Sequence, residues 1–375
     1  MPQVKYSEMI KQPHSKIALV GDMLGEGGAE RVQARLSIYF EKQGVEVHHI
    51  IVRDIVTYKY AGTLFNMGKL KNKSNGLLNK LKRLLALKKY LKDNQFDYII
   101  DFRVKNSFIQ EYIIANWVYN VPYIMSIRSF ETAYYFPENN YLASIIYKKA
   151  YGLVTVSKLL EEKLRKNYNY QKIKTIYNPI IADEIKKEST SVKPFDFKYF
   201  IGLGRMQDNI KQFDHLIKAF QRSNAIADDF KLVLMGDGVY KSILVDLVQK
   251  ESLEGSVVFL PYMENPFPYI MNAYTMALTS KNEGFPNVLI ESLACGVPVV
   301  SYDCESGPSE IILDESNGLL VKNNDIDAMA DAIDRMITNT NLYKQCASNS
   351  VDSIQKFNLD AIGKEWLDYL KITVA

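Results

Sequence analysis

Short runs of apolar, often β-branched residues alternate with longer amphipathic stretches along the whole chain. The first run, 16–20 (KIALV), is followed by a glycine-rich turn over 21–28 and a helical pattern over 29–43. Further apolar runs in this half are 45–52, 98–102, 123–127 and 153–156, with helical segments between most of them. Because strands that alternate with helices form parallel sheets covered by helices, this half predicts a doubly wound α/β domain.

The same alternation restarts after a polar stretch, 186–194 (KKESTSVKP), which we expect to be a linker. A helical pattern covers 213–222. The apolar runs of this half are 199–203, 231–235, 257–260, 276–279 and 299–301. Two doubly wound units facing one another would bind a ligand at the carboxyl ends of their strands, so we expect the site in a cleft between them.

Length and composition agree with two folded domains. A chain of 375 residues exceeds the usual size of a single core, and its 47% hydrophobic and 24% charged residues exclude a disordered protein. Three cysteines and four histidines suggest neither a disulfide framework nor a zinc site. The first 16 residues lack the apolar core of a signal peptide, and no apolar run is long enough to span a membrane. We therefore expect a cytoplasmic protein.

Charge is distributed unevenly along the chain. The net charge is +3, but residues 1–192 hold 30 Lys and Arg against 18 Asp and Glu, while the remainder holds 16 against 25. A basic first half indicates an anionic partner, which composition leaves open as nucleic acid, a membrane surface or a phosphorylated substrate.

The segment 69–92 concentrates this charge, with nine Lys and Arg and no acidic residue. Leucines recur in it at helical spacing, at positions 77, 78, 81, 84, 85 and 91. The pattern predicts a basic amphipathic helix. Two interpretations stay open: a helix whose leucines pack on the sheet, or one that binds a membrane or lipid phosphate.

The most informative run is 280–298 (SKNEGFPNVLIESLACGVP), where a strand ends, a loop follows and a helix begins near Asn287. Gly284 in the loop lets a ligand approach the backbone closely. The N–H groups of Asn287 and Val288 at the start of the helix form an anion-binding position. A phosphate group is the ligand that this arrangement favours.

Two glutamates accompany that position, Glu283 in the loop and Glu291 within the helix. A carboxylate does not favour phosphate, but it accepts strong hydrogen bonds from vicinal hydroxyls, such as those of a sugar or a ribose. The alternative is an ordinary loop charge and a solvated helix residue.

Two cations precede them in the same predicted sheet. Arg205 ends the strand in the run 202–205 (GLGR), and Lys211 opens the next helix. A guanidinium and an ammonium at one sheet edge can hold a diphosphate and stabilise its departure without a metal ion. Taken alone, both residues are equally consistent with ordinary surface charges.

These motifs, together with 25–31 (GEGGAER), the Glu-x7-Glu run EGFPNVLIESLACGVPVV and 307–325, resemble the retaining glycosyltransferases of family 4, the group 1 type. The resemblance covers nearly the whole chain and is most specific in its C-terminal third. It implies a GT-B fold, with two facing Rossmann-like domains, an interdomain cleft and a C-terminal crossover helix. The domains would be 1–185, which binds the acceptor and is completed by 357–375, and 195–356, which binds the donor.

The resemblance also implies roles for single residues. Arg205 and Lys211 would hold the donor diphosphate, Glu283 the donor sugar and Glu291 the ribose, so that Glu283, Arg205 and Lys211 are the residues expected at the reacting centre. Further donor contacts would come from Gly27, Gly28, Tyr262, Gly284, Phe285, Asn287 and Val288. Neither a metal nor another cofactor is implied, and the expected reaction is a same-face displacement assisted by the leaving diphosphate.

The sequence departs from the family's pattern in two places. One extra residue lies between Arg205 and Lys211 compared with the commonest spacing. The first domain has Ser126-Ile127-Arg128 where many relatives carry histidine. In that position Arg128 would meet an acceptor phosphate or a donor oxygen.

The implied substrates are a nucleotide sugar and a saccharide acceptor. The runs 265–270 (NPFPYI) and SKNEGFPN look closest to relatives that use UDP-linked hexoses or N-acetylhexosamines. In similar enzymes the acceptor is often carried on a polyprenyl diphosphate, so the basic segment would suit the inner face of an anionic membrane, in surface polysaccharide or glycan assembly. No nucleic-acid partner is expected.

Two other functions remain open at this level: a nucleotide-sugar epimerase of the same fold, and a non-catalytic sugar-nucleotide-binding protein. A dinucleotide oxidoreductase is disfavoured because 21–28 (GDMLGEGG) lacks a G-x-G-x-x-G fingerprint. The D-x-D at 325–327 is more readily a helix start than a metal site.

Overall fold

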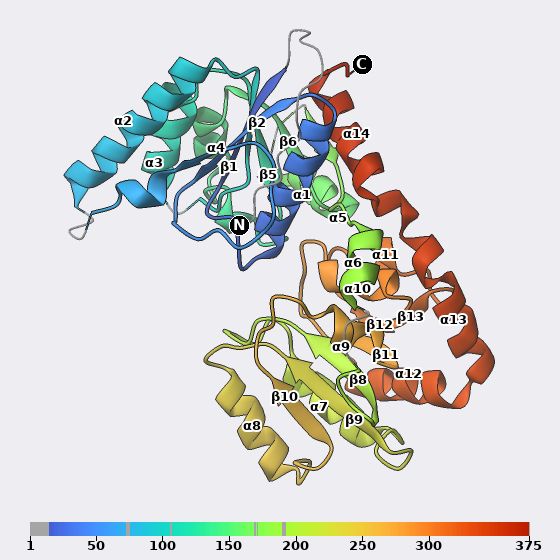
Figure 1. Ribbon diagram of the computed structural model, residues 1–375. Coiled ribbons are helices and arrows are strands. Elements are labelled where there is room, and N and C mark those ends of the chain that lie inside the picture. Colours follow the sequence, from blue (N-terminus) through green and yellow to red (C-terminus); the bar gives the residue numbers. More distant parts are fainter. Residues whose placement is uncertain are drawn as a thin grey trace. The chain divides into compact units, whose positions relative to one another are not determined.

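The computed structural model describes residues 15–72, 76–105, 107–168, 170, 172–189 and 193–374 (Figure 1). The chain forms two compact units. Unit 1 comprises Met1–Pro179 and Leu359–Ala375, and unit 2 comprises Ile180–Asn358. Most of the N-terminal segment in which we found no signal-peptide pattern lies outside the described residues.

Unit 1 is built on a seven-stranded parallel sheet with the order β3-β2-β1-β4-β5-β6-β7. Its strands are β1 Lys16–Gly21, β2 Glu46–Ile51, β3 Thr63–Asn66, β4 Tyr98–Asp101, β5 Tyr123–Ile127, β6 Ala150–Thr155 and β7 Ile173–Thr175. The five strands expected from the apolar runs are confirmed. The two edge strands were missed because both are short and neither forms a long apolar run.

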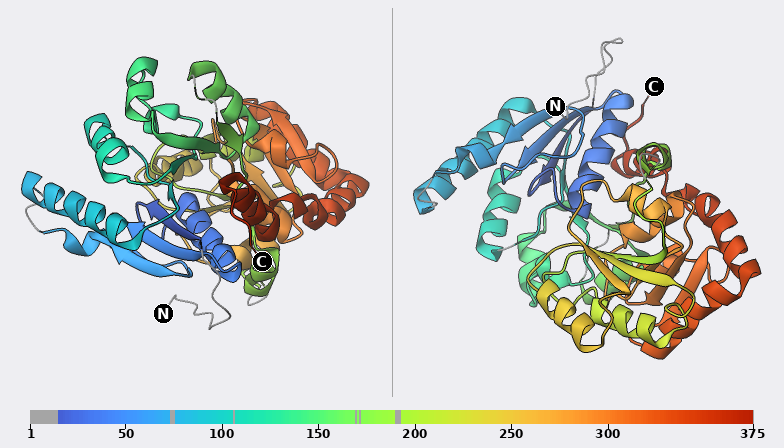
Figure 2. Two further views of the ribbon diagram at one scale, coloured as in Figure 1. Left: turned by 90° about the horizontal axis from the view of Figure 1, so that it is seen from above. Right: turned by 60° about the horizontal axis from the view of Figure 1, so that its bottom comes forward.

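Helices cover this sheet and include the end of the chain. They are α1 Gly28–Lys42, α2 Leu77–Asn94, α3 Phe108–Ile113, α4 Asn140–Ile146, α5 Lys158–Asn167 and α14 Leu359–Leu370, with short turns η1 Met67–Leu70, η2 Ile114–Val118 and η3 Thr132–Tyr134. Helix α14 packs against α1 (Figure 2). The approach is close: a Cβ on Gly363 would lie 2.2 Å from the ring of Tyr39. The C-terminal helix therefore completes unit 1; Ala375, the last residue of the expected segment 357–375, lies outside the described residues.

Unit 2 is built on a six-stranded parallel sheet with the order β10-β9-β8-β11-β12-β13. Its strands are β8 Lys198–Leu203, β9 Phe230–Met235, β10 Val257–Leu260, β11 Thr275–Leu278, β12 Val299–Asp303 and β13 Gly318–Lys322. Its helices are α6 Ala182–Ser189, α7 Phe213–Arg222, α8 Lys241–Lys250, α9 Phe267–Met271, α10 Asn287–Ala294, α11 Pro308–Ile311, α12 Ile326–Thr338 and α13 Thr340–Ser353, with the turn η4 Gln355–Phe357. The five predicted strands are confirmed, and β13 was not predicted.

The polar stretch 186–194 is not simply a linker. Its first four residues belong to α6, which packs against α9 and α10, and unit 2 already begins at Ile180. Lys186 and Lys187 lie on the exposed face of this helix, while Ile185 and Ser189 are buried. The boundary therefore lies before the stretch that composition indicated, and 190–192 lie outside the described residues.

Each sheet reverses its winding beside its first strand. In unit 1 the chain runs outward from β1 through β2 to β3 and then continues on the other side of β1 with β4. In unit 2 the strands β8 and β11 have the same relationship. Ligands of doubly wound sheets bind outside the carboxyl ends of the strands at such a switch point. The carboxyl ends of β1 and β4 in unit 1, and of β8 and β11 in unit 2, are therefore the expected places of ligand binding.

Candidate functional site

The loops that follow β8 and β11 are tied together at the switch point of unit 2. The N–H of Lys281 donates to the carbonyl of Ile210 at 2.8 Å. The buried hydroxyl of Thr279 lies 3.0 Å from the carbonyl oxygen of Lys211 and 2.9 Å from that of Gln212. These bonds fix the backbone of Lys211 beside the loop that carries Glu283.

The side chains of Lys211 and Glu283 form an ion pair at this edge, with 2.6 Å between Nζ and Oε1. The hydroxyl of Ser280 donates to the same oxygen, also at 2.6 Å. The two charged side chains are only 22% and 12% exposed. Within the described residues the second oxygen of Glu283, Oε2, has no hydrogen-bond partner. The pair is thus held in place and keeps one acceptor oxygen for a ligand.

Glycines allow the strand ends to approach one another here. A Cβ on Gly204 would lie 3.0 to 3.1 Å from three side-chain carbons of Lys211, so the lysine stem passes directly over this residue. Gly236 has a φ of +151°, and a Cβ there would lie 1.9 Å from the carbonyl oxygen of Gly204. Only glycine fits such a position. We had not singled out Gly236, although a Gly-Asp-Gly run directly after an apolar strand was visible in the sequence.

Arg205 follows Gly204 and is exposed. Within the part of the chain that the structure describes, its side chain forms no ion pair and no hydrogen bond. The structure therefore brings Lys211 to Glu283 but shows no contact of Arg205 with either, and leaves the guanidinium available to a ligand.

Helix α10 begins at Asn287, as predicted, so the N–H groups of Asn287 and Val288 lie in its first turn. Pro286 precedes them as the N-cap, a residue whose side chain cannot cap the helix. The preceding loop is fixed by Ser306, whose hydroxyl donates to the carbonyl of Gly284 at 2.9 Å.

Phe285 lies in this loop with its ring buried. The ring packs edge-on against Phe357, with 5.3 Å between the centroids. Since packing occupies the side chain, the backbone is the part of Phe285 that can serve a ligand, as the family resemblance implies.

Glu291 is the fifth residue of α10 and is only 4% exposed. This excludes the alternative of a solvated helix residue. Its charge contributes to the environment of the Cys295 thiol, whose pKa is raised to about 12 by burial first and by Glu291 second. Burying a carboxylate is costly, so a position of this kind needs a function or good partners.

Tyr262 lies in the loop after β10 with half of its side chain exposed. Its N–H donates to Oδ2 of Asp237 at 2.6 Å, and Lys241 pairs with the other oxygen at 3.0 Å. The N–H of Tyr262 first, and then Lys241, lower the pKa of Asp237. Asp237, which sequence reasoning missed, thus fixes the loop that carries Tyr262, one of the expected donor contacts.

Arg128 follows β5 in unit 1 and is held by several partners. Its guanidinium donates to Ser126 at 3.2 Å and to Asn178, and it lies over the ring of Phe102 at 5.6 Å. Burial lowers the pKa of Arg128 to about 10, so the group stays charged at neutral pH. The N–H of Arg128 donates to the hydroxyl of Tyr135 at 3.2 Å.

Gly27 and Gly28 lie at the start of α1, Gly27 as the N-cap and Gly28 as the first helical residue. A Cβ on Gly27 would lie 2.1 Å from Oε2 of Glu30, so that side chain folds back over the loop. The structure therefore places both glycines at a helix N-terminus, and leaves their proposed contact with a donor phosphate as a prediction.

The D-x-D at 325–327 is a helix start, as expected: Asp325 caps α12 by accepting the N–H of Ala328 at 3.0 Å. Among the described residues, no group of three or more His, Cys, Asp or Glu side chains is arranged to hold a metal ion.

Most of the basic segment lies in α2, whose leucines are buried near its end and exposed near its start. Leu87 and Leu91 are buried, as in a core-packed helix. The leucines nearer its start are not, with exposed fractions of 84% for Leu77, 85% for Leu78 and 50% for Leu81. The described helices include none long and apolar enough to cross a membrane. Residues 73–75 of the segment lie outside the described ones.

Comparison with known proteins identifies the family. A family described as "Glycosyl transferases group 1" matches residues 183–352, and one described as "Glycosyltransferase Family 4" matches residues 26–184. The fold is similar to that of Anabaena HepE in complex with UDP-glucose, with a TM-score of 0.77 at 18% identity, covering 96% of this chain and 100% of that one. The chain is a GT-B glycosyltransferase of the group 1, family 4 type.

Two relatives of this glycosyltransferase come from Campylobacter jejuni subsp. jejuni serotype O:2. One is an N-acetylgalactosamine-N,N'-diacetylbacillosaminyl-diphospho-undecaprenol 4-alpha-N-acetylgalactosaminyltransferase, 29% identical over 92% of this chain and 97% of the relative. The other, which acts on GalNAc-alpha-(1->4)-GalNAc-alpha-(1->3)-diNAcBac-PP-undecaprenol as an alpha-1,4-N-acetyl-D-galactosaminyltransferase, is 28% identical over 94% and 97%. Nothing in these comparisons supports the epimerase or the non-catalytic binding protein.

Proposed function

We propose that the enzyme transfers an N-acetylhexosamine or a hexose from a UDP-sugar to a saccharide carried on a polyprenyl diphosphate, with retention of configuration and without a metal ion. The observation that carries the proposal is the ion pair of Lys211 and Glu283, 2.6 Å apart at the carboxyl ends of β8 and β11.

The two kinds of group at this edge match the two parts of a nucleotide sugar. Arg205, Lys211 and the first turn of α10 offer positive charge and N–H donors, which suit a diphosphate. Oε2 of Glu283 offers an acceptor that suits a sugar hydroxyl. Because Lys211 bonds to Glu283, a diphosphate bound by this lysine would bring its attached sugar to the glutamate.

A direct displacement on one face of the sugar is the route that these residues favour. The acceptor oxygen forms a bond to the anomeric carbon while the bond from that carbon to the diphosphate oxygen breaks. The acceptor proton passes to the departing diphosphate, whose growing charge Arg205 and Lys211 would stabilise. Oε1 of Glu283 already binds Lys211 and Ser280, which makes this carboxylate a poor nucleophile for a covalent intermediate.

The relatives support the substrate classes. Both Campylobacter enzymes are named as N-acetylgalactosaminyltransferases that act on undecaprenyl-diphosphate saccharides. The similar fold of HepE was solved with UDP-glucose. A UDP-linked donor and a lipid-linked acceptor are therefore the pair to test first.

Helix α2 supports attachment to the membrane that such an acceptor occupies. Leu77 and Leu78 are almost fully exposed on a helix whose charged residues are nearly all basic. Trp117 of η2 lies beside α2, is 47% exposed and carries Lys88 over its ring at 3.4 Å. Exposed leucines with an interfacial tryptophan and lysines fit the surface of an anionic bilayer.

The test is a panel of UDP-sugars, GDP-sugars and their N-acetyl forms incubated with the purified enzyme in EDTA, with and without the undecaprenyl-diphosphate saccharide of the first relative. We expect UDP release that rises with the acceptor, and an α-linked product by NMR from an α-linked donor. A β-linked product would contradict retention. Isomerisation of the nucleotide sugar without acceptor would contradict a transferase.

A further inference from the structure

The switch point of unit 1 carries a carboxylate to which the transfer reaction assigns no role. Asp22 is the first residue after β1, and the segment after β4 lies next to it. The carbonyl of Asp22 accepts the N–H groups of Val52 at 3.2 Å and Arg53 at 2.8 Å, which fixes its backbone. Asp22 therefore lies at the carboxyl ends of the strands beside the switch point of unit 1, as Glu283 does in unit 2.

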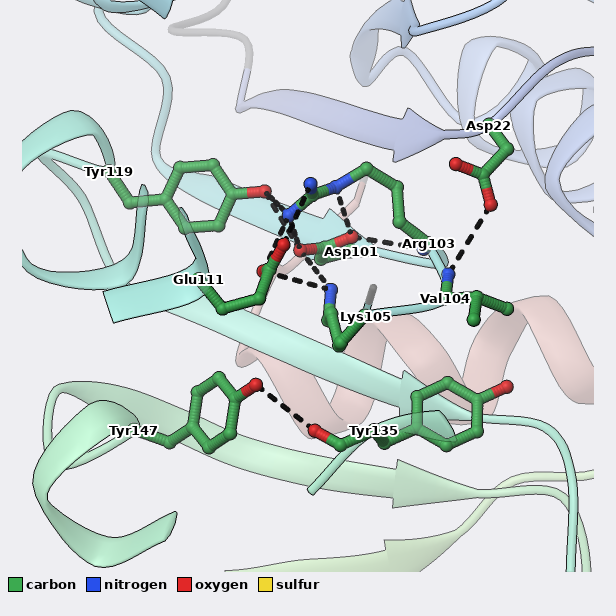
Figure 3. Close-up of polar contacts among 9 residues, drawn as sticks. All are labelled: Asp22, Asp101, Arg103, Val104, Lys105, Glu111, Tyr119, Tyr135 and Tyr147. Carbon is green, nitrogen blue, oxygen red and sulfur yellow. Dashed lines mark hydrogen bonds and ion pairs between the residues drawn. The ribbon is translucent and has the colours of Figure 1, made fainter. Parts of the chain in front are cut away.

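The carboxylate of Asp22 uses only one of its two oxygens in a hydrogen bond within the described residues. Oδ2 accepts the N–H of Val104 at 3.3 Å, a long bond (Figure 3). Within the described residues Oδ1 has no hydrogen-bond partner. An ionised carboxylate offers about four acceptor positions, so most of the capacity of Asp22 is unused.

A buried charge cluster behind Asp22 fixes the segment that carries Val104 (Figure 3). Asp101, the last residue of β4, accepts bonds from Arg103 at 2.7 Å and Lys105 at 2.6 Å, and from the hydroxyl of Tyr119 at 2.9 Å. Glu111 of α3 pairs with Arg103 at 3.1 Å. All five side chains are at most 7% exposed.

This cluster cannot itself bind a ligand. It contains two acids and two bases, so its charges balance, and none of its buried polar side-chain atoms lacks a partner within the described residues. Burial alone would raise the pKa of Asp101, but the charges of Arg103 and Lys105 outweigh it and bring the pKa below its ordinary value. Arg103 and Lys105 therefore have structural roles. Asp22, beside the cluster, is the side chain that can still accept hydrogen bonds from a ligand.

Charge decides which ligand Asp22 accepts. The cations of the cluster, Arg103 and Lys105, are occupied, and a carboxylate repels phosphate, so Asp22 itself is unsuited to a phosphate ligand. Burial raises the pKa of Asp22, and Arg103 partly offsets the rise. A partly desolvated carboxylate gains most from a neutral hydroxyl donor, because such charge-assisted bonds are about twice as strong as neutral ones.

We propose that the carboxylate of Asp22 binds a hydroxyl group of the saccharide acceptor. The inference rests on the proposed function, in which the acceptor is a saccharide. Asp22 holds the acceptor through one of its hydroxyls, and the cluster of Asp101 and Arg103 keeps that carboxylate in place through Val104. The proton of the reacting hydroxyl still leaves with the diphosphate.

Asp22→Asn tests the proposal, because the amide oxygen can still accept from Val104 while the charge is lost. Asp97→Asn is the matched control: Asp97 also accepts one backbone N–H, from Lys16 at 2.7 Å, but at the amino-terminal edge of the same sheet. Asp22→Ser is a second variant in case the first folds poorly. The acceptors are n-octyl glycosides of N-acetylgalactosamine, N-acetylglucosamine and glucose, together with the undecaprenyl-diphosphate saccharide, each with the UDP-sugar that wild type uses.

We expect Asp22→Asn to lower kcat/KM for the acceptor about 10- to 100-fold, with the KM of the donor and the rate of donor hydrolysis in water unchanged. Saturation-transfer NMR should show weaker binding of the octyl glycoside to this variant, and Asp97→Asn should behave as wild type. Unchanged acceptor kinetics, or an equal loss of donor hydrolysis, would overturn the proposal. Absence of transfer and of donor hydrolysis in wild type would overturn the proposed function, and this inference with it.

Discussion

The Nζ atom of Lys211 lies 2.6 Å from Oε1 of Glu283, although 72 residues separate them in the chain. The pair joins the loop after β8 to the loop after β11, the two strands that flank the switch point of unit 2. A cation that suits a diphosphate and an anion that suits a sugar hydroxyl are therefore in direct contact. Such preorganisation reduces the cost of orienting a donor.

Glu283→Gln should lower kcat about 10- to 100-fold and leave the affinity for UDP nearly unchanged. The amide keeps the bond from Ser280, but the charge-assisted bond to a sugar hydroxyl is lost. Steady-state kinetics and calorimetry with UDP measure the two effects. Glu254→Gln, at an exposed position of the same unit, serves as the control. A large loss of UDP affinity in Glu283→Gln would mean that Glu283 mainly positions Lys211.

Arg205→Ala should weaken UDP binding about tenfold, and Arg205→Lys should restore only part of it. The reason is that lysine keeps the charge but cannot form the forked hydrogen bonds of a guanidinium with phosphate. Because the Arg205 side chain has no partner within the described residues, neither change should lower the melting temperature by more than about 2 °C. Equal UDP affinity in all three proteins would remove Arg205 from the donor site.

Gly204→Ala should weaken UDP binding several-fold with little effect on folding. The added Cβ would lie 3.0 to 3.1 Å from three carbons of the Lys211 stem, so this stem must move and its contact with Glu283 is disturbed. Gly255→Ala is the control, because a Cβ there meets nothing within 4 Å. If both variants bound UDP like wild type, the position of the Lys211 stem would not matter for the donor.

His49 should make folding depend on pH. Burial lowers its pKa to about 3. It is held between the side-chain amide of Gln33 at 3.1 Å and the carbonyl of Ala61 at 3.2 Å. The unfolded chain binds the proton with an ordinary pKa of 6.5, so stability is complete above that value and falls below it, by about 1.4 kcal/mol for each pH unit.

Denaturant unfolding at pH 7.5, 6.5 and 5.5 checks this prediction, with His49→Gln as the comparison. Burial also lowers the pKa of the neighbouring His48, so some dependence should persist in that variant. Equal pH profiles for wild type and His49→Gln would show that His49 does not control the loss.

The double variant Leu77→Ser, Leu78→Ser should lose binding to anionic vesicles while its melting temperature stays within about 2 °C of wild type, because both side chains are exposed. Cosedimentation with vesicles of phosphatidylglycerol and phosphatidylcholine measures the binding. Val239→Ser, at an equally exposed apolar position of unit 2, is the control. Wild-type binding that is the same for neutral and anionic vesicles would exclude the electrostatic contribution of α2.

The sequence predicted secondary structure best in buried strands, where the run of apolar residues is uninterrupted. The central strands were predicted because parallel strands covered on both faces are nearly uninterrupted apolar runs. The edge strands β3 and β7 and the helix α6 were not, since short or half-exposed elements look like loops. The start of α10 near Asn287 was predicted because Pro286 stands directly before it, and the fixed φ of proline suits the first turn of a helix.

The sequence by itself determined the residue types of the proposed donor site, because Arg205, Lys211, Glu283 and Glu291 occur in motifs whose spacing along strand, loop and helix fixes their place in a parallel sheet. Only the tertiary structure decided that Lys211 contacts Glu283, that Ser280 shares the same oxygen, and that Glu291 is buried. The same holds for Asp22, whose side chain accepts the N–H of Val104, 82 positions further along the chain. Contacts between distant segments depend on strand order and side-chain packing, which no local pattern encodes.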